Sequence, residues 1–326
     1  MHKSLCYREA LKALDWGTET VYAIGHKAPD TDTVTAAIAY ADLMQKIGYS
    51  VEACIAGKAN NETKYAAALF GFPLPPILED ARGKTLILVD HSETCQAVAG
   101  AKEARILQII DHHGLGDVME SKRIFAKIFP VGSTCTIIFT CYQEFGVEVT
   151  KKIAQILLAG IVSDTQNLKK KTTTEMDRVV CKILAERLNI SSENLEMIYA
   201  EMKKAAKNFD DMTDEEIFNS DAKDYVINGH KFRLGSLSFD DKKSINSFLQ
   251  RMLGVMPKIL KDSANEMIFC NVSCHKHSYI LYFTDLAKKI AESVYGASKD
   301  AGIIYVDHRL NRKVDIVPAI TQALLS

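Results

Sequence analysis

The sequence predicts an α/β protein of two domains: an N-terminal parallel sheet with helices on both faces, then a smaller C-terminal α/β domain. In the first half of the chain, short apolar runs alternate with segments of helical spacing. After a charged stretch at residues 203–216, the pattern changes to strands of hairpin type. With 326 residues, the chain is also longer than a single hydrophobic core usually supports.

The elements of the first domain follow one another in the order that a parallel sheet requires. The apolar runs typical of buried strands lie at residues 20–24, 85–89 and 106–110. The segments of helical spacing lie at residues 34–47, 134–145, 151–162 and 174–188. Because parallel strands are joined by crossover helices, this alternation predicts a sheet that is covered on both faces.

The second domain begins after the charged stretch, and we predict a division into residues 1–205 and 206–326. Residues 225–227 and 232–239 flank Asn228-Gly229, which predicts a hairpin around a type I′ turn. A helix from about residue 241 should end or kink before Pro257, because proline cannot donate the next helical hydrogen bond. Two strands, a further helix and a last strand complete the prediction, with the strands at residues 267–272, 278–283 and 303–306.

Composition excludes several classes of protein. The chain is 47% hydrophobic and 25% charged, as is ordinary for a soluble globular protein. Its formal net charge is -1, so the protein as a whole lacks the basic field that is typical of nucleic-acid-binding proteins. The longest apolar stretch, residues 156–162, is far shorter than the roughly 18 residues of a membrane span. The eight cysteines show no disulfide spacing and no secretory signal is visible, so we expect free thiols, a cytoplasmic location, and neither membrane nor nucleic-acid partners.

Three clusters of acidic and histidine residues come directly after the three predicted strands. They are His26-x3-Asp30-x-Asp32, Asp90-His91-Ser92-Glu93 and Asp111-His112-His113. In an open parallel sheet, ligands bind beyond the carboxyl ends of the strands, so we expect the clusters to converge on one site. Taken singly, each cluster also suits a structural role, such as a helix N-cap at Asp32. A further acid, Asp164, ends the apolar helix at 153–162.

Carboxylates and imidazoles at this density repel one another or compete for protons unless a cation lies among them. A pair of divalent ions about 3.5–4 Å apart would resolve the conflict and present a metal-bound hydroxide to a phosphorus atom. The ligands of one ion would be His26, Asp30 and Asp90, and those of the other would be Asp32, Asp90, His112 and Asp164, with Asp90 bridging. Because this shell contains imidazole nitrogen and no thiolate, it favours Mn²⁺ or Co²⁺ over Mg²⁺.

These motifs resemble those of the DHH phosphoesterases, and within that superfamily the family II inorganic pyrophosphatases, the manganese-dependent type. The resemblance extends from about Tyr22 to the C-terminus and includes Pro130-Val131-Gly132-Ser133-Thr134 before a helix. Ser220-Asp221-Ala222-Lys223 and Asn311-Arg312-Lys313 resemble that family's substrate-binding segments. The resemblance implies a DHH domain, a DHHA2-type domain and an active site in the cleft between them.

The resemblance also implies a role for each matching residue. His26, Asp30, Asp32, Asp90, His112 and Asp164 correspond to ligands of two Mn²⁺ ions. His113 corresponds to a residue that contacts substrate and donates a proton or hydrogen bond. Lys223, Arg312 and Lys313 correspond to cations that bind pyrophosphate, which suits the planar fork of arginine and the point charge of lysine. A homodimer is implied as well, and an additional Mg²⁺ arriving with the substrate is left open.

Two alternatives share the N-terminal motifs. An exopolyphosphatase would release phosphate from longer polyphosphate, and the basic run Lys169-Lys170-Lys171 either attracts such a chain or forms a solvated face. A phosphodiesterase of short nucleic acids or cyclic dinucleotides would favour a glycine-rich nucleotide-binding loop in the second domain, and the sequence has no Gly-Gly-Gly-His-type string there. Hydrolysis of inorganic pyrophosphate is therefore the function that the sequence predicts.

Overall fold

The computed structural model describes residues 2–118, 120, 122–209, 212–239, 241–298 and 302–325, with side chains from residue 7 onward. The chain forms two compact units, Met1–Ala206 and Lys207–Ser326. Among the described residues, no helix combines the length and apolar character that a membrane span needs. The seven described cysteine side chains form no disulfide, as the sequence predicts, and the side chain of Cys6 lies outside the described part.

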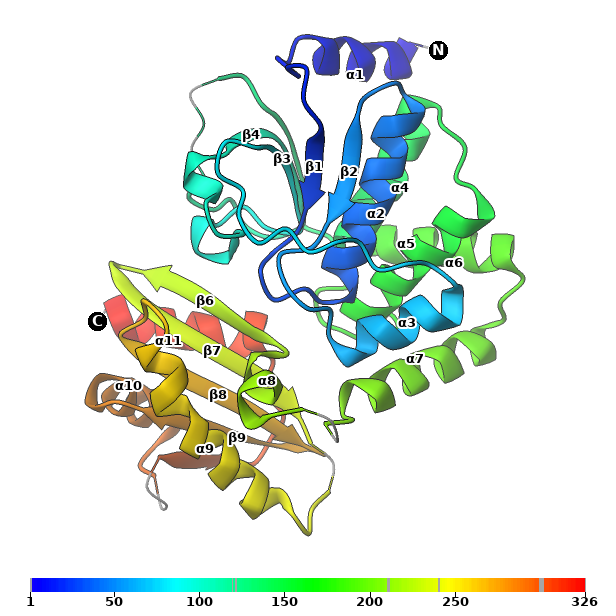
Figure 1. Ribbon diagram of the computed structural model, residues 1–326. Helices are drawn as coiled ribbons and strands as arrows, with labels where there is room; N and C mark the ends of the chain where they lie inside the picture. The colour runs from blue at the N-terminus through cyan, green and yellow to red at the C-terminus, as the bar shows by residue number, and fades with distance from the viewer. Residues whose placement is uncertain are drawn as a thin grey trace. The chain divides into compact units, whose positions relative to one another are not determined.

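The first unit is built on a five-stranded parallel sheet, which confirms the predicted parallel sheet (Figure 1). Its strands are β1 (Val21–Ile24), β2 (Val51–Cys54), β3 (Thr85–Val89), β4 (Arg105–Asp111) and β5 (Phe125–Ile128). They lie in the order β2-β1-β3-β4-β5. The three predicted strands are therefore adjacent in the middle of the sheet, and the two that the sequence did not indicate flank them.

One face of this sheet carries the α-helices and the larger core. The helices are α1 (His2–Lys12), α2 (Thr31–Lys46), α3 (Asn61–Phe70), α4 (Thr134–Phe145), α5 (Lys151–Asp164), α6 (Glu175–Leu188) and α7 (Ser192–Ala206). The alternate strand residues Val21, Ala23, Ile87 and Val89 pack against them. Burial of this continuous apolar surface is the main favourable term for folding the unit.

The opposite face has a different cover from the helices that we expected there. Ile24, Leu86 and Leu88 pack against irregular chain around residues 78–81 and 97–104, which includes the 3₁₀ turn η2 (Ala101–Glu103). The physical reason lies partly in the connection before β3. That connection contains Pro73, Pro75 and Pro76, which lack the N–H donors of a helix.

The second unit is a separate α/β layer with its own mixed sheet in the order β10-β9-β8-β7-β6. Its elements are α8 (Asp214–Asn219), β6 (Ala222–Ile227), β7 (His230–Ser238), α9 (Ile245–Lys261), β8 (Met267–Cys274), β9 (His277–Phe283), α10 (Asp285–Tyr295), β10 (Ile303–Val306), the π-helical turn η3 (Arg312–Ile316) and α11 (Val317–Leu325). β6 and β7 form the predicted hairpin, and Asn228 and Gly229 have the positive φ angles of 50° and 80° that a type I′ turn needs.

Of the two outcomes expected at Pro257, a helix end or a kink, the helix end is wrong. α9 continues through Pro257 to Lys261. Proline costs a helix interior about 3 kcal/mol, but this helix buries an apolar face that includes Met252, Met256 and Ile259 on both sides of the proline. The charged stretch at residues 203–216 contains the division between the two units, after Ala206. Both neighbouring helices extend into it, because α7 ends at Ala206 and α8 begins at Asp214. Asp210 and Asp211 of that stretch lie outside the described residues.

Candidate metal centre

The three acidic and histidine clusters meet at the carboxyl ends of three adjacent strands. His26 follows β1, Asp90 follows β3, and Asp111 is the last residue of β4. Since β1, β3 and β4 are hydrogen-bonded neighbours, their carboxyl ends lie together at one edge of the sheet. The further acid expected at the site, Asp164, also reaches this edge. It is the last residue of α5, and its carboxylate lies close to His112.

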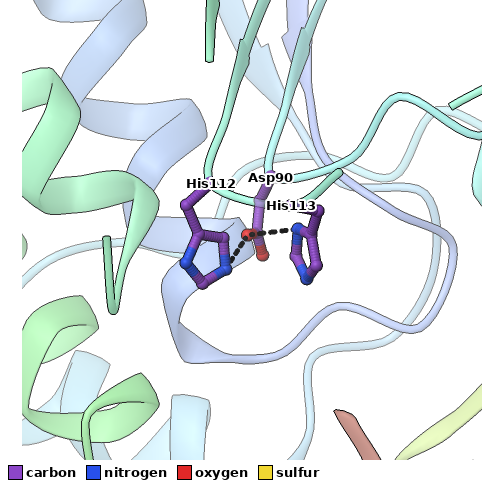
Figure 2. A group of neighbouring side chains, drawn as sticks. All are labelled: Asp90, His112 and His113. Carbon is purple, nitrogen blue, oxygen red and sulfur yellow. Dashed lines mark ion pairs between the residues drawn. The ribbon is translucent and has the colours of Figure 1, made fainter. Parts of the chain in front are cut away.

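Asp90 lies at the middle of the cluster. Its Oδ2 is 3.4 Å from Nε2 of His26, and its Oδ1 is 3.3 Å from Nε2 of His112. Figure 2 shows the carboxylate between the rings of His112 and His113, whose Nδ1 is 3.8 Å from Oδ1. Beyond these contacts, Asp30 lies 3.5 Å from His26, and Asp164 lies 3.2 Å from His112. The carboxylate of Asp90 thus contacts histidines that follow the two neighbouring strands, and two of these histidines in turn contact Asp30 and Asp164.

The potential ligand atoms form three overlapping groups, each with its atoms within 4.8 Å of one another. The groups are His26–Asp30–Asp90, Asp32–His112–Asp164 and Asp90–His112–His113. The first two correspond to the two ligand sets expected from the sequence, apart from the shared Asp90. Their donors are imidazole nitrogen and carboxylate oxygen, a set that fits Mn²⁺ or Co²⁺. The structure therefore has candidate acidic and histidine metal sites at this edge.

The backbone at Asp90 is strained. Its φ is 61°, a left-handed conformation that is uncommon for residues other than glycine. The turn is held by its N–H, which donates to the carbonyl of Ile110 at 2.9 Å. The carboxylate accepts hydrogen bonds from the hydroxyls of Thr33 at 2.6 Å and Thr134 at 3.1 Å. Backbone strain that is fixed in this way concentrates at functional sites.

The carboxylate of Asp32 is held by the N-terminus of α4. It accepts hydrogen bonds from Ser133 Oγ at 2.6 Å, Thr134 N at 2.7 Å and Cys135 N at 3.2 Å. Ser133 is also the N-cap of α4, so this residue both caps the helix and contacts the cluster. The N-cap of α2 is Asp30 rather than Asp32. Sequence reasoning missed these supports, which depend on tertiary contacts.

The electrostatics of the cluster call for a cation. Burial, with the nearby charges of Asp90 and Asp164, raises the pKa of Asp32 to about 7. Burial also pushes the pKa of Asp90 upward, but the imidazoles of His112 and His26 outweigh it and hold that pKa well below the ordinary value. Neighbouring carboxylates thus differ sharply in proton affinity, which is the behaviour of a site that contains more negative charge than its side chains balance.

The two histidines after β4 are oriented by hydrogen bonds. The carbonyl of Val131 lies 2.9 Å from Nδ1 of His112 and can only accept, so Nδ1 carries the proton and Nε2 is presented to the carboxylates. His113 donates from Nδ1 to Oδ1 of Asp111 at 2.8 Å. Burial would raise the pKa of Asp111, but the contact with His113 holds it below its ordinary value. Asp111 thus orients His113, a role that the sequence did not indicate.

Close packing beneath the cluster depends on one glycine. A Cβ at Gly160 of α5 would lie 2.4 Å from Oγ1 of Thr35 and 2.9 Å from Oδ1 of Asp32. Only a glycine lets α5 approach α2 this closely without displacing the carboxylate. A glycine inside an otherwise apolar helix was the signal for this contact in the sequence.

The three cations expected to bind substrate lie in the second unit. Lys223 is a buried residue of β6. Arg312 begins η3, and its Nη1 is 2.7 Å from Oδ1 of Asp221 and donates to the carbonyl of the same residue at 3.0 Å. The backbone N–H of Lys313 donates to Oδ1 of Asn311 at 2.9 Å. Asp221, two residues before Lys223, therefore links β6 to the turn that carries Arg312.

Comparison with known proteins identifies the same two regions. Residues 20–161 match the DHH family, N-terminal domain, and residues 200–323 match the DHHA2 domain. The chain is 35% identical over 309 residues to the manganese-dependent inorganic pyrophosphatase of Methanothrix thermoacetophila, covering 94% of this chain and 98% of that protein. It is also 35% identical over 317 residues to a probable manganese-dependent inorganic pyrophosphatase of Archaeoglobus fulgidus, with 93% and 98% covered.

A solved structure is similar over the same length. The crystal structure of the Methanococcus jannaschii putative family II inorganic pyrophosphatase superposes with a TM-score of 0.84 at 30% sequence identity. The match covers 94% of this chain and 100% of that one. The similarity therefore includes both units and not the metal-ligand motifs alone.

Proposed function

This chain belongs to the manganese-dependent inorganic pyrophosphatase family, and on that premise we propose that it hydrolyses inorganic pyrophosphate to two phosphates. The observation that carries the proposal is the carboxylate of Asp90, whose two oxygens face His26 and His112 in neighbouring candidate metal sites. A phosphoric anhydride with several negative charges is a substrate that such a centre suits, because bound cations offset charge on phosphorus and its oxygens.

We propose that two Mn²⁺ ions, or Co²⁺ in their place, bind at this centre. His26, Asp30 and Asp90 would hold one ion, and Asp32, Asp90, His112 and Asp164 would hold the other. When bound, the ions lower the pKa of water and stabilise charge on the phosphate. Nε2 of His112 is available as a ligand because its Nδ1 proton is committed to the carbonyl of Val131. A Mg²⁺ that accompanies the substrate is compatible with this scheme.

The remaining residues act on the substrate. We assign residues 1–205 to the catalytic domain and 206–326 to the substrate-binding domain. His113 is held by Asp111 and donates a hydrogen bond or proton to a phosphate oxygen. Lys223, Arg312 and Lys313 bind phosphate, and Asp221 orients the guanidinium of Arg312 for a bidentate contact.

The three consecutive lysines at residues 169–171, which could attract a longer polyphosphate, give that alternative less support in the structure. Of the three consecutive lysines, Lys169 pairs with Glu196 and Lys170 pairs with Asp164. Two of the three positive charges are thus directed at carboxylates of the same unit. We therefore retain pyrophosphate as the substrate.

We further propose that the protein is a cytoplasmic homodimer that does not bind nucleic acid. Light scattering of the purified protein tests the dimer.

One assay tests the activity and its alternatives together. Metal-free protein is reconstituted with Mn²⁺, Co²⁺ or Mg²⁺, and phosphate release is compared for pyrophosphate, tripolyphosphate, long polyphosphate and a dinucleotide. We expect pyrophosphate to be hydrolysed fastest, with Mn²⁺ or Co²⁺ more effective than Mg²⁺. Equal or faster turnover of long polyphosphate would assign the chain to the exopolyphosphatase alternative instead.

A further inference from the structure

Asp164 divides its two carboxylate oxygens between different partners. Its Oδ2 is 3.2 Å from Nε2 of His112, on the side of the candidate metal site. Its Oδ1 is 2.5 Å from Nζ of Lys170. The side chains of Lys170 and Asp164 are only 10% and 15% exposed, so water screens this ion pair less than a surface pair. A lysine thus contacts a carboxylate that the proposed function assigns to metal binding.

An unusual turn brings Lys170 to this position. Were α5 to continue beyond Asp164, a residue six positions later would lie about 9 Å further along the helix axis. Instead, Gln166, Asn167 and Leu168 have φ angles of 53°, 51° and 65°. Three consecutive non-glycine residues in the left-handed region carry a conformational cost that the surrounding contacts must offset. The chain is thereby turned back toward the end of α5.

Hydrogen bonds to Thr165 fix the turn. Its hydroxyl accepts from the N–H of Leu168 at 3.0 Å, and its carbonyl accepts from the N–H of Lys170 at 2.9 Å. The hydroxyl also donates to the carbonyl of Ile161, back in α5. The backbone of Lys170 is therefore hydrogen-bonded to Thr165, the residue that follows Asp164. This bond fixes the position from which the side chain of Lys170 extends.

The neighbouring lysine provides a contrast within the same turn. Nζ of Lys169 is 2.6 Å from Oε1 of Glu196, and both side chains are at least half exposed, at 62% and 50%. An exposed pair of this kind contributes little to stability, because water and salt screen it. Lys169 and Lys170 therefore have the same charge and adjacent positions, but only the second of the two contacts a residue of the candidate metal centre.

We propose that Lys170 is a positioning residue that sets the affinity of the metal site formed by Asp32, His112 and Asp164. By holding Oδ1, its ammonium group fixes the carboxylate plane and leaves Oδ2 as a single donor toward the ion. The preorganised ligand loses less rotational freedom when metal binds. Outer partners that orient metal ligands typically change affinity by about 10–100-fold when removed. The inference rests on the proposed function for the role of Asp164.

Direct measurement of Mn²⁺ binding tests the proposal on the full-length protein. Equilibrium dialysis and the electron paramagnetic resonance signal of unbound Mn²⁺ give the number and affinity of sites in wild type, Lys170→Met and Lys170→Gln. We expect wild type to bind two ions per chain. In both variants, one ion keeps its affinity and the other binds about 10–100-fold more weakly.

Matched variants separate position from charge. Lys169→Met removes the adjacent charge and should leave both affinities as in wild type. Lys170→Arg keeps a cation beside Asp164 and should recover most of the lost affinity, and thermal unfolding of the metal-free proteins verifies that each variant is folded. Unchanged or tighter binding of both ions in Lys170→Met and Lys170→Gln overturns the inference. A wild type that binds two Mn²⁺ but does not hydrolyse pyrophosphate overturns the proposed function alone.

Discussion

Oδ1 of Asp90 lies 3.3 Å from Nε2 of His112. Asp90 is the first residue after β3, and its backbone φ is 61°. The two residues come from adjacent strands, and the N–H of Asp90 is bonded to the carbonyl of Ile110, two residues before His112. The strained turn thus directs a carboxylate from one strand toward the imidazole of the next. This relationship makes Asp90 the residue on which both proposed metal ions depend.

Replacing Asp90 by Asn should abolish pyrophosphate hydrolysis while changing the fold little. Asparagine tolerates the left-handed conformation of this position and retains the side-chain shape, but it lacks the negative charge that both ions share. We expect kcat to fall by at least about 100-fold, and circular dichroism to remain as in wild type. Asp80→Asn, which alters an exposed partner of Arg82, is the matched control. Near-normal turnover in Asp90→Asn would contradict a bridging role.

The cations of the second unit should affect catalysis without affecting metal content. Arg312→Ala and Lys223→Ala each remove a positive charge proposed to bind phosphate, at an expected loss of about 2–4 kcal/mol of transition-state stabilisation. Steady-state kinetics give kcat and KM, and elemental analysis gives bound Mn²⁺. Arg251→Ala, which breaks a surface pair with Asp214, should behave as wild type. Loss of Mn²⁺ from either variant would show that these residues act at the metal centre.

Mn²⁺ should stabilise the protein more at pH 8 than at pH 5.5. The pKa of Asp32 in the metal-free fold is about 7, above its ordinary value of 3.8. The stability that the protonated carboxyl contributes is therefore present at low pH and is lost as pH rises through 7. At pH 8 the carboxylate of Asp32 is charged, and a bound ion offsets its repulsion by Asp90 and Asp164. At pH 5.5 the ion must instead displace a proton from Asp32. Melting temperatures with EDTA or excess Mn²⁺ measure the difference, and an equal or larger gain at pH 5.5 would refute the argument.

Asp177 should be important for stability although it lies outside the cluster. Its buried carboxylate accepts from Gly132 N at 2.8 Å, Thr136 Oγ1 at 2.7 Å and Thr174 N at 2.7 Å, so it ties α6 to the segment that supports Asp32. Asp177→Ala leaves these donors unsatisfied and should lower the free energy of unfolding by about 3–5 kcal/mol. Thr174→Ala removes the N-cap of α6 and the one hydrogen bond that the Thr174 hydroxyl donates to Asp177, and should cost only about 1 kcal/mol. Urea unfolding of both variants, measured without metal, distinguishes this structural role from loss of metal.

Much of the architecture follows from local pattern. The apolar runs that became β1, β3 and β4 and the periodicity of α4, α5 and α6 are properties of short segments, as is the Asn228-Gly229 turn. Strand β2 was missed because its four residues include Glu52 and show no apolar run. The end of α9 was misjudged because a local rule about Pro257 competed with burial of an entire helix face, and burial prevailed.

The sequence by itself determined which chemical groups follow which strands, because a strand and the residues after it are continuous in the chain. It therefore predicted that His26, Asp90 and His112 would converge. Only the tertiary structure decided what holds them: the N-terminus of α4 against Asp32, and Lys170 turned back onto Asp164. Those contacts depend on how helices pack and on a left-handed turn without glycine, and neither is encoded in a spacing that can be read from a single segment.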